Sequence, residues 1–343
     1  MISGYRFFAY ITGYEAEHML ELAMLMCPKC GAPLDCADKN EVLCVCGEAY
    51  QRLPTGGMDF LQSGGFPDFK LDKDDMQQHA LLEKEGAGVA TRINEFIIPM
   101  IRRFASCAAR NFRSLTVLDC GCGGGLSVDI MKDQGLEAWG IDAGRARHRQ
   151  WQQRLCRNSL ISANALRIPF ADASFDVVLS FGLIEHLGIH EEESADGYHA
   201  YRLTDCHAQR RLFVRELVRV MKHDGFLVLD HPNGAFPADF WHGGVAGSIR
   251  WHKSFEDMLP RFKEIETYFG DADSHLRLIS LSPSRRLSFN KVGAHWYGRV
   301  FAPAMKLWLR MMELRPLSFL ARSFLNPYLI TVATRRLDFQ SWV

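Results

Sequence analysis

The sequence lacks an excess of charge of either sign. Lysine and arginine together number 40, aspartate and glutamate also number 40, and the formal net charge of the 343 residues is zero. A chain without a basic surplus or basic runs has no general electrostatic attraction to nucleic acid or to an anionic membrane, although a local patch would escape this count. Nucleic acid is therefore not an expected partner.

The sequence also lacks long apolar runs. No stretch reaches the roughly 18 to 20 apolar residues that a membrane-spanning helix needs, so we expect no transmembrane segment. Residues 1–26 have neither the apolar centre nor the small-residue cleavage site of a secretory signal, and we expect a cytoplasmic protein. Because Met24 and Met26 directly precede the first cysteine motif, residues 1–26 are either a genuine N-terminal extension or an artefact of an upstream start assignment.

The stretch that organises the chain is residues 117–126, Val-Leu-Asp-Cys-Gly-Cys-Gly-Gly-Gly-Leu. Its apolar residues predict a buried strand, its glycines a tight turn, and the residues that follow a helix. Such a turn lets backbone N–H groups approach a nucleotide. The dinucleotide fingerprint Gly-x-Gly-x-x-Gly fails here, because Leu126 occupies the position of the third glycine. Asp119 would repel a pyrophosphate and attract an ammonium or sulfonium group.

A second acidic residue follows the next predicted strand. Residues 136–141 read as that strand and end before Asp142. This carboxylate stands about twenty residues beyond the first glycine, where an acidic side chain can accept hydrogen bonds from ribose hydroxyls. A cationic amino-acid group joined to a nucleoside describes S-adenosylmethionine, which is the cofactor that these residues predict.

Four motifs in order resemble the class I S-adenosylmethionine-dependent methyltransferases of the small-molecule kind. They are residues 117–123, 140–142, 164–165 and 168–178. The resemblance covers about residues 88–233 well and the strand near residues 328–334 more loosely. It implies an α/β fold with a doubly wound, seven-stranded Rossmann-like sheet.

The resemblance also implies roles for individual residues. Asp119 and the backbone of residues 121–123 would hold the methionine part of the cofactor, and Asp142 would hold the ribose. Asn164 and Ala165 would contact the adenine, although Asn164 could instead be a turn-forming residue. The full expected set is Asp119, Gly121, Cys122, Gly123, Asp142, Asn164, Ala165 and Phe181, the last at the end of a further predicted strand.

Alternation of strand and helix independently predicts a parallel, doubly wound sheet, whose ligands sit at the carboxyl ends of the strands. The expected strands are 115–120, 137–141, 160–163, 175–181 and 226–230, and the expected helices are 126–134, 145–157 and 208–222.

Four of the ten cysteines form a cluster with the spacing of metal ligands: Cys27, Cys30, Cys44 and Cys46. Residues 27–61 resemble the small zinc ribbons that precede bacterial methyltransferases, which implies a structural zinc ion. Cys36 is an alternative ligand to Cys44, because the second pair is Cys-x-Cys where Cys-x-x-Cys is commoner. The other interpretation is a relic module that holds no metal. We expect residues 62–75 to be a linker and residues 76–343 to be the methyltransferase domain.

Transfer of a methyl group from a sulfonium requires an aligned nucleophile, and a hydroxyl or amine acceptor usually also needs a general base. The candidates are the pair Glu185-His186, after the fourth core strand, and His231, after the fifth. The pair resembles quinone-type O-methyltransferases, which hold a divalent metal with such a pair and a carboxylate three residues earlier. Gly182 stands at that earlier position and counts against a metal. The alternative is a structural role for both histidines.

The acceptor pocket is expected in the aromatic and histidine-rich residues 233–252, with Asn233, His242, Arg250 and His252 as its polar lining. Residues 188–206 are a long insertion that could cover the site, and residues 234–327 are expected to cover the substrate. Residues 301–324 have a wide apolar face and a narrow charged one. That segment either packs over the active site or lies on a membrane surface to reach a lipid-linked acceptor.

These features together predict S-adenosylmethionine-dependent methyl transfer to a small-molecule or lipid-linked acceptor, at oxygen in preference to nitrogen. One alternative is methylation of a ribosomal RNA base, because a guanine-methylating family also joins an N-terminal zinc module to this fold. Another is a non-catalytic scaffold that binds the cofactor.

Overall fold

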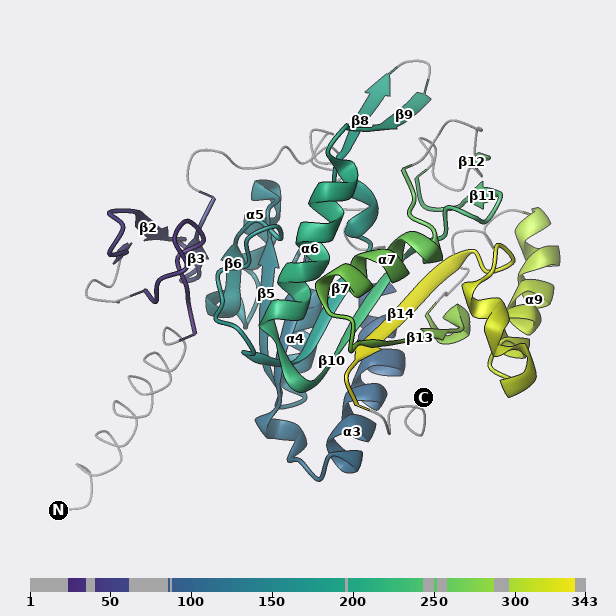
Figure 1. Ribbon diagram of the computed structural model, residues 1–343, viewed down its shortest axis with the longest axis horizontal. Coiled ribbons are helices and arrows are strands. Elements are labelled where there is room, and N and C mark those ends of the chain that lie inside the picture. Colours follow the sequence, from purple (N-terminus) through teal and green to yellow (C-terminus); the bar gives the residue numbers. More distant parts are fainter. Residues whose placement is uncertain are drawn as a thin grey trace.

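The computed structural model describes residues 24–34, 41–61, 86, 88–194, 197–242, 250–251, 258–286 and 296–336. A ten-stranded sheet runs through the molecule in the order β1-β2-β3-β6-β5-β4-β7-β10-β14-β13 (Figure 1). Its strands are β1 (Glu41–Leu43), β2 (Ala49–Arg52), β3 (Met58–Asp59), β4 (Thr116–Cys120), β5 (Glu137–Asp142), β6 (Leu160–Ser162), β7 (Phe175–Phe181), β10 (Met221–Pro232), β13 (Arg277–Leu281) and β14 (Tyr328–Thr334). Two separate hairpins pair β8 (Ile189–Ser194) with β9 (Gly197–Arg202) and β11 (Ala238–Asp239) with β12 (Arg250–Trp251).

Seven of these strands form the doubly wound sheet that the sequence predicts. The strands from β6 to β10 are parallel, and β14 runs antiparallel between β10 and β13. The chain winds outward in both directions from β4, which lies between β5 and β7. This reversal is the topological switch point, where open α/β sheets bind their ligands. The predicted fold class is confirmed.

Helices cover both faces of the sheet (Figure 1). Helices α6 (Cys206–Val220) and α7 (Phe262–Ala272) pack on one face through Phe213 and Ile265. On the other face, α3 (Ile98–Cys107) and α4 (Leu126–Asp133) pack through Phe104 and Met131. Every residue of β4 and β7 is consequently buried, which explains why apolar residues stand at consecutive positions in both strands and do not alternate with polar ones.

The N-terminal cysteine module extends the sheet at its β6 edge. Asp59 of β3 pairs with Ser162 of β6, and the N–H of Phe60 donates to the Ser162 carbonyl over 2.8 Å. Tyr50 belongs to the same apolar core as Trp139 of β5. The sequence predicts a module ahead of a linker, whereas the structure makes it an edge of the main sheet. Residues 62–75, the expected linker, and residues 1–23 of the expected extension lie outside the described residues.

The helix predicted over residues 145–157 is much shorter in the structure. It consists of a 3-10 turn, η3 (Arg145–Arg147), and a single turn, α5 (His148–Trp151). The reason is that this segment bends to hold the glycine turn: the Trp151 indole donates to the Gly123 carbonyl over 2.8 Å, and Arg154 Nε donates to the Gly124 carbonyl over 2.7 Å.

The C-terminal region contains α9 (Trp296–Met311) and η7 (Arg315–Arg322), which lie beside the β13 edge of the sheet (Figure 1). Leu309 and Met312 are buried, but Phe301, Leu307 and Phe319 are between 63% and 65% exposed. Within the described ranges, every helix is too short or too polar to cross a lipid bilayer.

Candidate functional site

The glycine turn between β4 and α4 lies at the switch point of the sheet. Gly121, Gly123 and Gly125 have φ values of +86°, +54° and +77°, which favour glycine. The N–H groups of Gly121 and Cys122 donate to the Ile141 carbonyl at the end of β5, over 2.8 and 3.0 Å. A Cβ atom at Gly123 would meet no atom within 4 Å, so the backbone there borders open space.

Asp119 lies at the end of β4 with only 2% of its surface exposed. Its Oδ2 accepts a hydrogen bond from the Ser127 hydroxyl, whereas its Oδ1 is buried without a hydrogen-bond partner among the residues that the structure describes. Burial raises the pKa of Asp119 to about 6, against the hydrogen bond from Ser127 that lowers it. A buried carboxylate oxygen without a donor is costly unless a ligand supplies one.

Asp142 ends β5 and faces the same turn. Its Oδ2 accepts from the N–H of Gly123 over 2.8 Å, and its Oδ1 accepts from the N–H of Gly144 over 2.8 Å. The carboxylate therefore holds the glycine turn as well as facing the expected ribose. Cys122 fills the room beside Gly140, where an added Cβ would lie 2.8 Å from the Cys122 sulfur.

Asn164 and Phe181 complete the expected cofactor set. Asn164 follows β6, and its Oδ1 accepts from the N–H of Leu166 over 2.9 Å, which is the bond of a turn-forming asparagine. Phe181 ends β7, and the Arg92 guanidinium lies 4.2 Å from the centroid of its ring. Ala165 is half-buried against the apolar core. The structure thus places all eight residues near the carboxyl ends of β4 to β7, while their cofactor roles remain predictions.

A buried polar network beside this edge was not predicted from the sequence. Asp230 of β10 accepts from the Tyr328 hydroxyl over 2.8 Å and from Arg286 Nε over 2.7 Å. Arg92 lies close enough to Asp119 and Asp230 to interact with both charges. The only sequence signal was the position of Asp230 at a strand end, because its partners come from distant segments.

The two catalytic candidates differ in their surroundings. His231 is fully buried in β10, its Nδ1 lies 2.7 Å from the Pro232 carbonyl oxygen, and burial lowers its pKa to about 4. His186 ends the short 3-10 turn η5 (Ile184–His186), keeps 29% of its side chain exposed, and has its Nδ1 2.5 Å from Glu191 Oε1. Glu185 is buried, and burial raises the pKa of its carboxyl.

Of the expected acceptor residues, the structure describes the side chains of Asn233 and His242, and their role in an acceptor pocket stays a prediction. Asn233 is buried, and its Nδ2 donates to the carbonyls of Ser323 and Asn326 over 3.0 and 2.8 Å, which anchors the chain ahead of β14. His242 instead lies beside His186, with ring centroids 5.1 Å apart. Arg250 lies in β12, and His252 lies outside the described residues.

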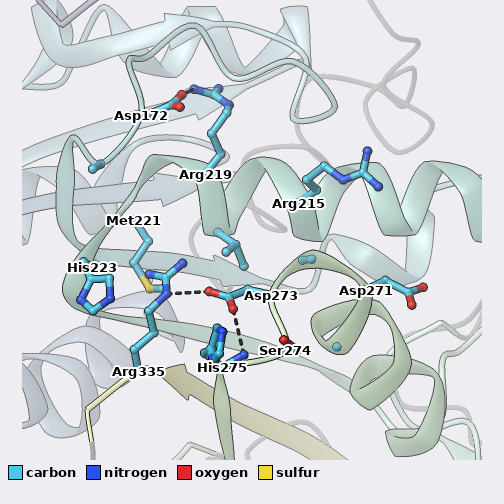
Figure 2. Close-up of a pocket in the computed structure, with 14 residues that line it drawn as sticks. Asp172, Arg215, Arg219, Met221, His223, Asp271, Asp273, Ser274, His275 and Arg335 are labelled. Carbon is cyan, nitrogen blue, oxygen red and sulfur yellow. Dashed lines mark hydrogen bonds and ion pairs between the residues drawn. The ribbon is translucent and has the colours of Figure 1, made fainter.

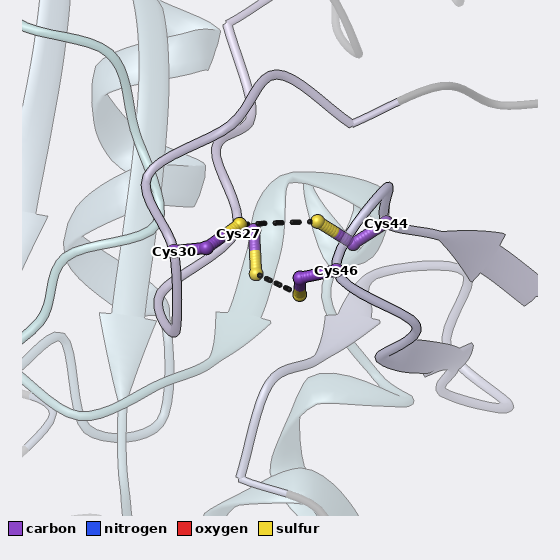
Figure 3. A group of neighbouring side chains, drawn as sticks. All are labelled: Cys27, Cys30, Cys44 and Cys46. Atoms are coloured by element: carbon purple, nitrogen blue, oxygen red, sulfur yellow. Dashed lines mark hydrogen bonds between the residues drawn. The ribbon is translucent and has the colours of Figure 1, made fainter.

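The cysteine cluster has the geometry of a zinc site (Figure 3). The sulfurs of Cys27 and Cys46 are 3.8 Å apart, those of Cys30 and Cys44 are 3.4 Å apart, and all four lie within 4.8 Å of one another. Thiolates about 2.3 Å from a tetrahedral zinc ion are about 3.8 Å apart, so these residues fit that ion. Cys36 lies outside the described residues.

The surroundings of Cys27 favour a thiolate. Burial opposes ionisation of Cys27, but hydrogen bonds with the Tyr50 hydroxyl and the backbone N–H groups of Cys30 and Lys29 outweigh it and lower the pKa of the thiol to about 6. The thiolate is the form of cysteine that binds metal.

A large surface hollow lies elsewhere (Figure 2). It has a volume of about 1130 Å³ and is lined by Ala173, just before β7, by Met221 at the start of β10, and by Arg335, just after the antiparallel β14. These positions mark the amino ends of the parallel strands. Because Asp119 and Asp142 lie at the carboxyl ends, the hollow is not part of the cofactor site.

Residues 118–229 match a family described as "Methyltransferase domain". A probable S-adenosylmethionine-dependent methyltransferase of Mycobacterium tuberculosis is 29% identical over 127 residues, which are 37% of this chain and 37% of that protein. A ubiquinone biosynthesis O-methyltransferase of Mesorhizobium japonicum is 33% identical over 84 residues, 23% of this chain and 34% of that one.

Among solved structures, the plantazolicin methyltransferase BamL in complex with a triazolic analog and SAH aligns with a TM-score of 0.44 and 12% identity, over 76% of this chain and 91% of that chain. The chain spans little more than a third of the length of the relatives it matches in sequence.

Proposed function

We propose that the protein transfers a methyl group from S-adenosylmethionine to an oxygen of a small-molecule or lipid-linked acceptor, because residues 118–229 match a methyltransferase-domain family and a relative of this region is a probable S-adenosylmethionine-dependent methyltransferase. The cofactor supplies the sulfonium methyl group, and the residues of this chain bind and orient it. The single observation that carries this proposal is the buried Oδ1 of Asp119 beside the glycine turn, which has no hydrogen-bond partner among the described residues.

The binding roles follow from charge and hydrogen-bond capacity. An ionised Asp119 attracts the ammonium group of the methionine part, whose N–H groups satisfy the buried oxygen. The Asp142 oxygens already accept one backbone hydrogen bond each, but a carboxylate has about four lone-pair sites, so ribose hydroxyls can be added. The Asn164 amide nitrogen and the Ala165 backbone are the proposed contacts of the adenine edge.

Glu185 and His186, which follow β7, are proposed to activate the acceptor. His186 is partly exposed, so an acceptor hydroxyl can reach it, and Glu191 orients its ring. Both properties are required of a general base. His231 is a weaker candidate, because a fully buried imidazole with a pKa of about 4 is a poor base near neutral pH. Glu185 directly precedes His186 in η5, so the same role is proposed for the pair.

The cysteine module is proposed to hold a structural zinc ion through Cys27, Cys30, Cys44 and Cys46. A module this short has little core of its own, and the metal contributes folding free energy. Its packing against β6 links that stability to the sheet edge that carries Asn164.

A lipid-linked acceptor is favoured by one surface observation. Phe301, Leu307 and Phe319 expose more than three fifths of their surface on α9 and η7. Arg310 and Arg315 lie in the same segment. Exposed apolar residues flanked by arginines are typical of helices that lie on a membrane surface.

The acceptor class can be tested with methyl-labelled S-adenosylmethionine. Purified protein is incubated with a water-soluble metabolite extract and with an organic-phase lipid extract, and label in each is compared with that given by an Asp119→Asn variant. Asp119-dependent labelling that is base-labile or lost on ether cleavage supports an oxygen acceptor. Labelling of RNA in a parallel arm would overturn the proposed acceptor class.

A further inference from the structure

Three potential metal ligands gather beyond the end of β7. Glu185, His186 and His242 each offer one ligand atom, and these atoms all lie within 4.8 Å of one another. The two imidazole rings meet at an angle of 68°, edge to face. Glu185 and His186 come from η5, whereas His242 follows β11, so the fold builds this group from separate parts of the chain.

Each histidine of the group has a carboxylate within hydrogen-bond distance of its Nδ1 atom. His186 Nδ1 lies 2.5 Å from Glu191 Oε1, and His242 Nδ1 lies 2.8 Å from Asp239 Oδ2. A carboxylate beside Nδ1 favours the tautomer with the proton on that nitrogen, and so leaves the lone pair on Nε2. Proteins orient metal-binding histidines in this way, and such outer carboxylates also raise the basicity of the ligand.

Glu185 provides an independent indication of a cation. Only 2% of its surface is exposed, and its Oε2 has no hydrogen-bond partner within the described part of the chain. The nearby buried Arg210 directs Nη2 to the backbone carbonyls of Glu185 and Met258, not to the Glu185 carboxylate. A buried carboxylate oxygen of this kind is stabilised when it coordinates a metal.

Gly182 leaves room for the Glu185 side chain. An added Cβ at Gly182 would lie 3.5 Å from Glu185 Oε1. The Glu185 side chain thus lies over Gly182. His242, which no local motif connects to Glu185, brings the third ligand from beyond β11.

We propose that Glu185, His186 and His242 bind a divalent transition-metal ion, with Glu191 and Asp239 as the outer partners of the two histidines. Two nitrogens and one oxygen suit Zn²⁺, Fe²⁺, Co²⁺ or Mn²⁺ better than Mg²⁺ or Ca²⁺, which prefer all-oxygen sites. Three protein ligands leave an open coordination position, and the partly exposed side of His186 gives access to it.

The ligand of the open position is an oxygen of the acceptor, a role that rests on the proposed function. The metal would make a bound acceptor hydroxyl more acidic, so that its proton passes to solvent water without a separate general base. The oxygen would then form a bond to the methyl carbon while the bond from that carbon to sulfur breaks, and S-adenosylhomocysteine would leave. In the metal-bound protein, His186 is then a ligand and not the base. Gly182, directly after the expected cofactor residue Phe181, places this site beside the cofactor edge of the sheet.

The test counts Co²⁺ ions bound to the metal-free full chain by elemental analysis, and reads their ligands from the absorption spectrum. We expect two ions per chain, one with thiolate charge-transfer bands and one without. Glu185→Gln and His242→Ala should each lose only the second ion, whereas Cys30→Ser should lose the thiolate bands and keep it. The matched controls Glu137→Gln and His199→Ala alter exposed residues and should keep both.

Replacing one of the outer carboxylates should weaken metal binding without abolishing it. Asp239→Asn should retain the second ion at saturating Co²⁺ but bind it about 10- to 100-fold more weakly. Thermal melting of each variant monitors folding. If His242→Ala does not fold, the nearly isosteric Glu185→Gln shows whether the second ion depends on the proposed ligands. A single, thiolate-bound ion in the wild type, or a second ion unaffected by both Glu185→Gln and His242→Ala, would overturn the metal site.

Calorimetric titration of S-adenosylhomocysteine into the same samples separates the two proposals. Protein that binds S-adenosylhomocysteine but no second metal ion contradicts only the metal site. Protein that holds the second metal ion but binds no S-adenosylhomocysteine contradicts the proposed function instead.

Discussion

The Asp142 carboxylate accepts a hydrogen bond from the backbone N–H of Gly123 over 2.8 Å. The end of β5 thereby holds the glycine turn that follows β4, and one side chain serves both the shape of the turn and the proposed ribose contact. Gly144, on the other side of Asp142, donates to the second carboxylate oxygen. The edge where the cofactor is proposed to bind is therefore held in place by one bond from the glycine turn to the end of β5 and by one local bond after β5.

Replacing Asp142 should weaken this arrangement. Asp142→Asn keeps the shape but loses a charge-assisted acceptor, which is worth about 1.5–3 kcal/mol. We expect S-adenosylhomocysteine to bind at least tenfold more weakly, as measured by calorimetry. Asp172→Asn changes a carboxylate whose side chain is 79% exposed and should bind as the wild type does. Equal losses in both variants would contradict the proposed role of Asp142.

Cofactor affinity should depend on pH through Asp119. Burial raises the pKa of this carboxyl to about 6, and only its ionised form attracts the ammonium group. Affinity for S-adenosylhomocysteine should therefore be nearly constant above about pH 7 and fall by up to about tenfold for each unit below about pH 6. The measurement is the dissociation constant as a function of pH. In Asp119→Asn, binding should be weak and lack this dependence; an unchanged pH profile in that variant would assign the titration to another group.

Loss of the proposed zinc ion should destabilise the main sheet as well as the cysteine module. Cys30→Ser removes one thiolate, and we expect less zinc per chain by elemental analysis and a lower melting temperature. Because β3 is paired with β6, amide hydrogen exchange should also rise in β6. Cys107→Ser alters an exposed free thiol outside the cluster and serves as the control. Unchanged exchange in β6 would show that the module does not support that edge.

The close approach of the module to β6 gives a second test of the same edge. A Cβ at Gly57 would lie 1.9 Å from the Leu160 carbonyl oxygen, so Gly57→Ala forces the backbones apart. We expect a loss of about 1–3 kcal/mol in the free energy of unfolding, as is usual for overpacking, measured by urea denaturation. An added Cβ at Gly88 meets no atom within 4 Å, so Gly88→Ala is the matched control. Equal stability of the two variants would contradict the described packing.

The exposed apolar residues near the C-terminus should mediate binding to lipid vesicles. In sedimentation with anionic phosphatidylglycerol vesicles, Phe301→Ser combined with Phe319→Ser should reduce the bound fraction several-fold relative to the wild type. Leu155→Ser changes a residue that is 98% exposed in a different part of the chain and should have no effect. Failure of the wild type to bind would remove the support for a lipid-linked acceptor.

The sequence predicted those parts of the site that are encoded locally. Asp119 and the glycines of its turn are contiguous, and Asp142 follows one strand later, so strand periodicity and spacing suffice to place them at the switch point. The cysteine group was likewise predictable from two short motifs. In both cases a few adjacent residues specify the backbone and the chemistry together.

Features that depend on distant partners were not predictable. His242, which Asp239 contacts, meets His186 through the tertiary fold, and Arg286 reaches Asp230 from after β13. Asn233 donates to two backbone carbonyls ahead of β14, and the sequence did not predict these bonds. Such pairings depend on long-range packing, which no motif in the sequence reveals.

Asp119 and the glycine turn are proposed to bind S-adenosylmethionine, and calorimetric titration of S-adenosylmethionine into the full chain measures that binding. We expect saturable binding at one site per chain in the wild type and in Asp172→Asn, and a loss of at least tenfold in Asp119→Asn with the fold intact by thermal melting. No binding to the folded, zinc-loaded wild type, or equal binding to Asp119→Asn, would contradict the account.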